Sequence, residues 1–349
     1  MRWDKHHNIL VRHPHDLTVA WAQRVVNLHD PNTSVSAIET LSVDIGTTTR
    51  VRLAVAHDGA ATLARRWFIK LPSLNWRAWW ITALPQLLQT EIRFYQEQAA
   101  SVPVLCPTIL AAQRQCGQGT TLVMADVAEH GALAGSSADA LTAIQASAVI
   151  DQLALLHARF WQKTSPKQHW EDALGSALAV PLMRRGLKLA EDAVPATLLP
   201  AAMQYARQRR QAMHFLASGA HTLVHHDLHP GNLFWQQSQA GFLDWQLVRS
   251  GEGISDVAYF LATAIAPETR RAHERTLVER YQQQLAKEGV DADLSILWQR
   301  YRAHLVYPFE AMVVTLAVGG LMDLESNLEL IRRAATAVED HDAFAAMQI

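Results

Sequence analysis

One twenty-residue segment constrains the fold of this chain more than any other. It runs from His225 to Asp244, reads HHDLHPGNLFWQQSQAGFLD, and contains two aspartates and one asparagine. The apolar run HTLV at 221–224 precedes it, and GFL at 241–243 lies near its end. Both runs predict short buried strands. We therefore expect the polar side chains to lie in loops at strand ends, where a rigid backbone fixes catalytic atoms.

These polar residues have the chemistry that phosphoryl transfer requires. A carboxylate such as Asp227 can hold an attacking hydroxyl and accept its proton. Magnesium takes oxygen ligands, usually one or two from protein, and Asn232 and Asp244 can supply them. The Pro230-Gly231 pair predicts a turn that brings Asn232 back toward Asp227. The order His-x-Asp-Leu-x-x-x-Asn is that of the kinase catalytic loop, in which the aspartate accepts the substrate proton and the asparagine binds metal.

The histidines of the same segment allow a second interpretation. His225, His226 and His229 could be zinc ligands, and the first and last have the i, i+4 spacing of a helix. The Pro-Gly pair argues against a helix here, and no glutamate lies between the two histidines as the zinc-hydrolase pattern HExxH requires. A zinc hydrolase stays as an alternative that metal analysis of the purified protein would decide.

Several segments together resemble the aminoglycoside phosphotransferase and choline kinase superfamily, most closely its ecdysteroid-kinase-like branch. The most specific are HHDLHPGN at 225–232, FLDWQ at 242–246 and SDVAYFLA at 255–262. Supporting matches follow the same order along the chain: FIK at 68–70, EIRFYQE at 91–97, TLVMADV at 121–127 and LALLHARFW at 153–161. The resemblance extends from about residue 40 to about residue 265.

This resemblance implies an α+β, bilobal protein-kinase-like fold, with a small antiparallel sheet in the N-terminal lobe and a larger, mostly helical C-terminal lobe. It implies an ATP-dependent phosphotransferase that uses Mg²⁺ and moves the γ-phosphoryl group to a hydroxyl of a small molecule, of the aminoglycoside, amino alcohol, sugar or steroid class. ATP is expected between the lobes, with Asp227 as the base. A catalytically silent nucleotide-binding protein of the same fold is the alternative.

A lysine and a glutamate upstream are candidates for nucleotide binding. Lys70 ends a predicted strand, and its ammonium can neutralise phosphate oxygens. Glu91 lies on the next predicted helix and can pair with Lys70, although Glu97 on the same helix is a competitor. Taken alone, both charges could equally be ordinary solvated side chains.

Two backbone segments are further candidates. The run IGTTT has one glycine where protein kinases use three, and the amides and hydroxyls of Thr47 and Thr48 could cradle phosphate, or the run is only a turn. The strand LVMADV is the expected hinge, in which the backbone of Ala125 to Val127 contacts adenine and Met124 packs behind the base. Any buried strand has this appearance, so the assignment of this strand as the hinge depends on its position in the order of segments along the chain.

Two residues are expected to support the catalytic loop. Asp256 begins an apparent helix, where a carboxylate is stabilised by the helix dipole. By resemblance it instead accepts hydrogen bonds from the backbone of the catalytic loop. The resemblance also gives His225 a scaffold role, and His157 is predicted to be a packed core residue on an amphipathic helix.

The hydrophobic periodicity divides the chain into two parts. Helices are predicted over 16–28 and 83–99, and strands over 39–44, 50–57, 62–70, 107–112 and 120–125. From about residue 137 onward the pattern is mostly helical. We therefore expect a nucleotide-binding lobe over 1–127 and a catalytic and acceptor-binding lobe over 128–349.

Composition narrows the possible partners and location. The 349 residues are 49% hydrophobic with a net charge of −2, which gives no indication of disorder or of nucleic-acid binding. The only cysteines, Cys106 and Cys116, are too few for a disulfide framework. The start of the chain lacks a signal-peptide pattern, and the longest apolar stretch, 311–322, is too short to span a bilayer. We expect a cytoplasmic protein without membrane contact or an obligate protein partner.

The acceptor is expected to be a small molecule. Only eleven residues separate Asp244 from Asp256, and no Ala-Pro-Glu segment follows, so the activation loop with which protein kinases dock a peptide is missing. The acceptor should lie against the C-terminal helices, at 260–346. Acidic residues there could hold a polycation, and aromatic residues could hold a quaternary ammonium. The candidates are Tyr301, Tyr307, Phe309, Glu310, Asp323, Glu325 and Glu329. They could equally be ordinary core and surface residues.

Overall fold

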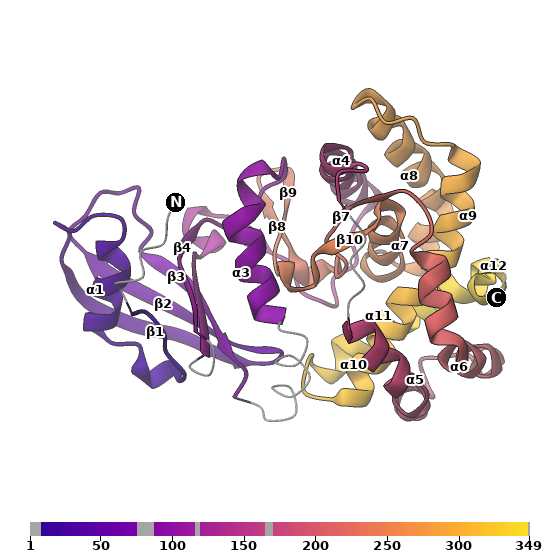
Figure 1. The fold of residues 1–349 in the computed structure, drawn as a ribbon, viewed down its shortest axis with the longest axis horizontal. Helices are drawn as coiled ribbons and strands as arrows, with labels where there is room; N and C mark the ends of the chain where they lie inside the picture. The colour runs from indigo at the N-terminus through magenta and orange to yellow at the C-terminus, as the bar shows by residue number, and fades with distance from the viewer. Residues whose placement is uncertain (1–7, 75–86, 116–118, 165–169, 348–349) are drawn as a thin grey trace. The chain divides into compact units, whose positions relative to one another are not determined.

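The computed structural model describes residues 8–74, 87–115, 119–164 and 170–347. The chain forms two compact units: unit 1 comprises 1–101 and 106–133, and unit 2 comprises 102–105 and 134–349 (Figure 1). The boundary predicted after residue 127 lies a few residues before this division. Residues 102–105 belong to unit 2, and within it Leu105 accepts a hydrogen bond of 2.9 Å from the amide of Phe242.

Unit 1 is built on one antiparallel sheet of five strands in the order β1-β2-β3-β5-β4. The strands are β1 (Val35–Ile45), β2 (Thr48–His57), β3 (Arg66–Pro72), β4 (Ile109–Gln115) and β5 (Gly119–Ala125). All five were predicted, but β3 begins later than the expected residue 62. A loop with its own turn, in which the amide of Leu63 donates to the carbonyl of Ala60 at 3.0 Å, separates β2 from β3.

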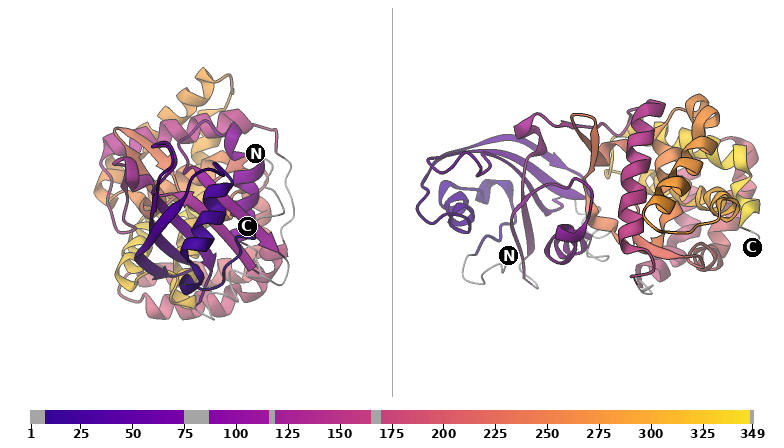
Figure 2. Two further views of the ribbon diagram at one scale, coloured as in Figure 1. Left: turned by 90° about the vertical axis from the view of Figure 1, so that its left-hand side faces the viewer. Right: turned by 90° about the horizontal axis from the view of Figure 1, so that it is seen from above.

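Two helices cover opposite faces of this sheet. Helix α1 (Val19–Asn27) is capped by Thr18 and buries Trp21 against Trp67 of β3, with the rings edge to face at 6.0 Å. Figure 2 shows α1 lying against the sheet. Helix α3 (Leu87–Glu97) packs Leu88 and Ile92 against Leu122 and Met124 of β5. Because successive strand residues alternate in direction, these β5 residues face away from the α1 side.

Unit 2 is mostly helical, as predicted. Its helices are α4 (Ala143–Phe160), α5 (Trp170–Leu189), α6 (Leu199–Leu216), α7 (Gly253–Ala264), α8 (Pro267–Lys287), α9 (Leu294–His304), α10 (Val306–Val318), α11 (Leu324–His341) and α12 (Ala343–Ala346). Every residue of α7 is buried, which fits a largely apolar helix that lies in the core. Of the residues that the structure describes, none belongs to a helix long and apolar enough to cross a membrane.

Two short antiparallel pairs carry the catalytic segment. Strand β7 (His221–Val224) pairs with β10 (Arg249–Glu252), and β8 (Leu233–Gln236) pairs with β9 (Gln239–Phe242). The runs at 221–224 and 241–243 were predicted as strands, whereas β8 and β10 were not. A short strand β6 (Leu133–Ala134) lies at the division between the units. Cys116 and residues 83–86 lie outside the described residues, so the cysteine pairing and the start of the second predicted helix are not tested.

Candidate active site

The catalytic loop leaves β7 at Val224 and closes on itself through Asn232. Pro230 to Asn232 form one turn of 3₁₀ helix, which directs the Asn232 side chain back along the loop. Its Nδ2 donates to the backbone oxygen of Asp227 at 2.8 Å and to Asp227 Oδ2 at 3.3 Å. The turn predicted from Pro230-Gly231 therefore has its expected geometry.

The other carboxylate oxygen of Asp227 is held by a tyrosine that was not among the predicted site residues. Tyr259 Oη donates to Asp227 Oδ1 at 2.7 Å. Burial raises the pKa of Tyr259 well above its usual value, so its hydroxyl keeps its proton. Tyr259 follows Asp256 by three residues on α7, which places both side chains on one helix face. This spacing was the signal that could have revealed it.

Asp256 lies beneath the loop and is fully buried. It accepts hydrogen bonds from the amides of His225, at 2.6 Å, and His226, at 2.8 Å. His157 Nε2 lies 3.2 Å from the same carboxylate, and Tyr281 Oη lies 2.8 Å from His157 Nδ1. Burial alone raises the pKa of Asp256, but the hydrogen bond and charge of His157 outweigh it and the pKa is lowered. Because a carboxylate only accepts, His157 donates to Asp256 through Nε2.

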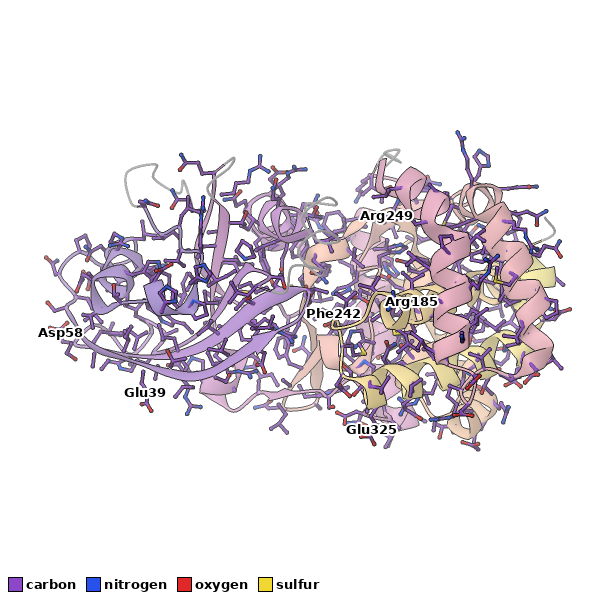
Figure 3. The ribbon with its side chains drawn as sticks, turned by 90° about the horizontal axis from the view of Figure 1, so that it is seen from below. Glu39, Asp58, Arg185, Phe242, Arg249 and Glu325 are labelled. Carbon is purple, nitrogen blue, oxygen red and sulfur yellow. The ribbon has the colours of Figure 1, made fainter. Side chains whose placement is uncertain are left out.

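Asp244 is tied to the loop through its neighbour Leu243. The amide of Leu243 donates to the carbonyl of Asn232 at 2.8 Å, and His225 Nε2 lies 2.7 Å from the Leu243 carbonyl. Asp244 itself has a left-handed backbone, with φ of 58°. Its preceding strand ends at Phe242, which is labelled in Figure 3.

His229 is a buried histidine of the same loop. Burial lowers the pKa of His229, and the negative charges of Asp227 and Asp244 partly oppose this shift. Its Nδ1 accepts from the amide of Gly231 at 3.1 Å.

The chemistry of Asn232 and Asp244 fits a magnesium ion. Nδ2 of Asn232 is used within the loop, which leaves its Oδ1 as the side-chain atom that can bind a metal. An amide oxygen together with a carboxylate is a donor set that Mg²⁺ accepts. A zinc site has less support. Across the residues described, no group of three or more histidine, cysteine, aspartate or glutamate side chains could hold a metal ion.

In unit 1, Lys70 and Glu91 form a buried ion pair. Lys70 Nζ lies 2.8 Å from each carboxylate oxygen of Glu91, and their side chains are 3% and 0% exposed. Lys70 is positioned by β3, between β2 and β5, and Glu91 by α3. Glu97, the competing candidate, is exposed on the same helix. Because both side chains are buried, Lys70 and Glu91 are not ordinary solvated side chains.

The turn between β1 and β2 is held by one hydrogen bond within its backbone and one from a serine side chain. The amide of Gly46 donates to the carbonyl of Thr48 at 3.0 Å, and Ser73 Oγ donates to the carbonyl of Gly46 at 2.7 Å. Thr48 is buried, and Thr47 is partly exposed. Of the two predicted phosphate-binding threonines, Thr47 is therefore the more accessible.

The predicted hinge is also occupied by internal hydrogen bonds. The amide of Ala125 donates to the carbonyl of Thr108, and the amide of Asp126 donates to the carbonyl of Arg66, both at 2.8 Å. Val127 begins a 3₁₀ helix that Asp126 caps. A nucleotide base could not use the amide of Ala125 without breaking this part of the sheet.

Residues 56–305, more than half of the chain, match the phosphotransferase enzyme family. The chain belongs to this family. A search of curated proteins gave no match. Among solved structures, the ethanolamine kinase of Plasmodium vivax has 11% identity and a TM-score of 0.51, with 97% of this chain and 91% of the other covered.

Two more solved structures are similar to this member of the family. The choline kinase of Cryptosporidium parvum has 10% identity and a TM-score of 0.52, with 94% of each chain covered. The GDP complex of a mutant aminoglycoside 2'-phosphotransferase-IIIa has 12% identity and a TM-score of 0.52, with 94% of this chain and 98% of the other covered. At these identities the similarity concerns the fold, and it confirms the predicted protein-kinase-like fold.

Most residues predicted to hold the acceptor in this phosphotransferase have structural roles instead. Glu310 is buried and bonded to Tyr205 and Arg209. Three further candidates are engaged elsewhere: Tyr301 donates to Glu274, Asp323 caps α11, and Glu329 pairs with Arg333. Phe309 is buried in the core, and Glu325 is exposed at the start of α11.

Tyr307 is the exception among these candidates. Its ring stacks on His226, with ring centres 4.2 Å apart and planes 21° apart, and lies 5.9 Å from the ring of Tyr259. This cluster adjoins Asp227. His226 was predicted only as a possible zinc ligand, and its stacking on a residue of α10 has no local sequence signal.

Proposed function

We propose that this chain transfers the γ-phosphoryl group of ATP to a hydroxyl of a small molecule. The observation that carries the proposal is the fixation of Asp227, with one carboxylate oxygen bonded to Tyr259 and the other to Asn232. Membership of the phosphotransferase enzyme family supports the reaction type. The similar folds of an ethanolamine, a choline and an aminoglycoside kinase support a small-molecule acceptor.

Asp227 is the base in this proposal. It aligns the acceptor hydroxyl with the terminal phosphorus and takes its proton late in the transfer. The two hydrogen bonds fix the carboxylate before the acceptor arrives, so the acceleration comes mainly from positioning. Asp256 supports the same geometry, because it holds the amides of the two residues that precede Asp227.

Asn232 and Asp244 are the proposed ligands of Mg²⁺. When bound, this ion neutralises phosphate charge and orients the β- and γ-phosphoryl groups. Two hydrogen bonds position these ligands. The side-chain amide of Asn232 donates to the backbone oxygen of Asp227, and the backbone amide of Leu243 donates to the carbonyl of Asn232. The His225 side chain is hydrogen-bonded to the carbonyl of Leu243 and so fixes the backbone directly before Asp244.

Lys70 is proposed to contact the phosphates of the same ATP, with Glu91 fixing its ammonium group. The partly exposed Thr47 and the buried Thr48 are proposed to line the phosphates. The segment from Ala125 to Val127 is proposed to contact the base through groups other than the amides of Ala125 and Asp126, which are already bonded. The resemblance to the ecdysteroid-kinase-like branch extends the possible acceptors to steroid alcohols, beside amino alcohols, sugars and aminoglycosides.

The test is acceptor-dependent release of ADP, measured with alcohols, amino alcohols, sugars, aminoglycosides and steroids in the presence of Mg²⁺. Asp227→Asn should lower kcat on the best acceptor by about 10²–10⁴-fold, the usual contribution of a general base, while ADP affinity measured by calorimetry is retained. Asp291→Asn, which removes an exposed carboxylate between α8 and α9, is the matched control. Normal turnover by Asp227→Asn would refute the assignment of the base.

A further inference from the structure

One face of the sheet in unit 1 carries two cations directly opposite each other. Arg50 of β2 pairs in register with Lys70 of the neighbouring strand β3 (Figure 1), and directly paired residues of an antiparallel sheet share a face. Lys70 contacts Glu91 of α3, so this is the face against which α3 packs. Thr48, two residues before Arg50 on β2, lies on the same face. Arg50 therefore adjoins two of the residues that are proposed to bind the phosphates of ATP.

The cations that flank Arg50 on this face have acidic partners. Lys70 Nζ lies 2.8 Å from each carboxylate oxygen of Glu91. Arg52, the next residue of β2 on this face, has its Nε 3.1 Å from Oδ2 of Asp126. Its guanidinium also lies over the ring of Phe68, 5.3 Å from the ring centre. Both flanking charges are thus compensated within unit 1.

Arg50 differs from its two neighbours. Its Nε is buried and has no hydrogen-bond partner among the residues that the structure describes. Asp44 of β1 pairs in register with Arg50 on the other side, but it is exposed, and within the described residues no ion pair joins the two side chains. A buried donor without a partner costs stability, and a like charge directly opposite adds to this cost. An anion bound on this face would satisfy the donor and offset the repulsion between Arg50 and Lys70.

We propose that Arg50 is a further nucleotide-binding residue, whose guanidinium binds phosphate oxygens of ATP beside Lys70. This inference rests on the proposed phosphotransferase function and adds a residue that neither the catalytic-loop motif nor the pair of Lys70 and Glu91 identifies. A guanidinium presents its N–H donors as a planar fork that matches two oxygens of a phosphate, whereas an ammonium acts as a point charge. Arg50 therefore orients the phosphates, and Lys70 neutralises them.

The experiment measures the Kd of ADP by calorimetry in the presence of Mg²⁺. Arg50→Gln should weaken ADP binding about tenfold to a hundredfold, the effect of losing hydrogen bonds from a charged group. The Kd of adenosine, measured by displacement of ADP, should stay unchanged because adenosine has no phosphate. Arg50→Lys, which keeps the charge but loses the fork, should weaken ADP binding less than Arg50→Gln.

Arg114→Gln is the matched control. Arg114 is an exposed arginine of the same sheet, on β4, which β3 and β5 separate from β2, and it donates to Gln89 at 3.0 Å. Removing this charge should leave the Kd of ADP unchanged.

Thermal unfolding without nucleotide tests whether Arg50 is needed by the fold. Arg50→Gln should melt no lower than the wild type, because the substitution removes the positive charge opposite Lys70. Arg50→Met, which keeps the apolar part of the side chain, supplies the same comparison if glutamine disturbs the strand.

The outcomes separate this inference from the proposed function. An unchanged Kd of ADP in Arg50→Gln and Arg50→Met would overturn the inference and leave the phosphotransferase intact. Equal losses for ADP and adenosine, or a lower melting temperature of both variants without nucleotide, would mean that Arg50 supports the sheet and would also overturn it. A wild type that neither binds ADP nor releases it with any acceptor would overturn the proposed function as well.

Discussion

The catalytic loop of unit 2 and the turn between β1 and β2 of unit 1 are both proposed to act on ATP, but they are held in different ways. The loop is fixed by side chains from distant parts of the chain: Asp256 holds its backbone, and Tyr259 and Asn232 hold Asp227. The turn is closed through the amide of Gly46 and the carbonyl of Thr48, and a single side chain named above, that of Ser73, donates to the carbonyl of Gly46. A network of side-chain contacts requires particular residues and therefore leaves a sequence motif, whereas backbone contacts leave almost none.

The largest effect is expected at Asp256, which anchors the loop held by side chains. Asp256→Asn keeps the shape of the side chain but removes the charge that His157 and two loop amides share. Breaking a buried charged network in this way should cost about 4–5 kcal/mol of unfolding free energy, measured by urea denaturation. We also expect kcat to fall about a hundredfold, because the loop loses its register.

Asp291→Asn, at an exposed position between α8 and α9, is the control and should be near neutral in both measurements. A variant Asp256→Asn that is fully active and as stable as the wild type would contradict the view that side chains fix this loop.

The next effect concerns Glu91 and compares two carboxylates of one helix. Glu91→Gln leaves the ammonium of Lys70 buried with only an amide partner, which should cost about 3–4 kcal/mol and raise the KM for ATP. Glu97→Gln, on the exposed face of α3, should change stability by less than about 0.5 kcal/mol. Thermal and urea unfolding check the stability of both variants, and initial rates check the KM. Equal effects of the two substitutions would contradict a specific pair with Lys70.

The fold could be predicted from the sequence where periodicity or a motif is local. The five strands of unit 1 have alternating or apolar patterns, and the loop from His225 to Asn232 has the residue spacing of a kinase catalytic loop at every named position. Strand β10, RSGE, has no such pattern and forms because Ser250 pairs with Leu223 of β7. A strand that forms only because of its pairing partner cannot be predicted from the local sequence pattern.

The same limit applies to the candidate site. His157 was predicted only to be a packed core residue, and its buried position agrees with that, but its partners Asp256 and Tyr281 lie 99 and 124 residues further along the chain. Tyr259 was within reach, since it lies one helical turn after Asp256. The stacking of His226 on Tyr307 could not be predicted, because it joins the catalytic loop to α10, which is distant in the sequence.

The smallest of these effects is a pH dependence that belongs to unit 2 alone. Glu252 joins β10 to α7 and is bonded to Arg300 and to the amide of Gly219. Burial alone raises the pKa of Glu252, but His304 and Arg300 outweigh it and lower the pKa to about 2. A carboxylate with a depressed pKa contributes fully above its unfolded pKa and loses that contribution as the pH falls. The shift from 4.5 to about 2 corresponds to about 3 kcal/mol, lost progressively below pH 5.

Urea unfolding of the wild type and of Glu252→Gln between pH 7 and pH 3 measures this contribution. The wild type should lose stability more steeply than the variant, because the variant has no carboxylate to protonate at this position. The ion pair of Lys70 and Glu91 remains in both proteins, so its contribution cancels in the difference. Parallel stability curves for the two proteins would mean that Glu252 does not anchor the β7–β10 pair, and that the loop of unit 2 depends on Asp256 alone.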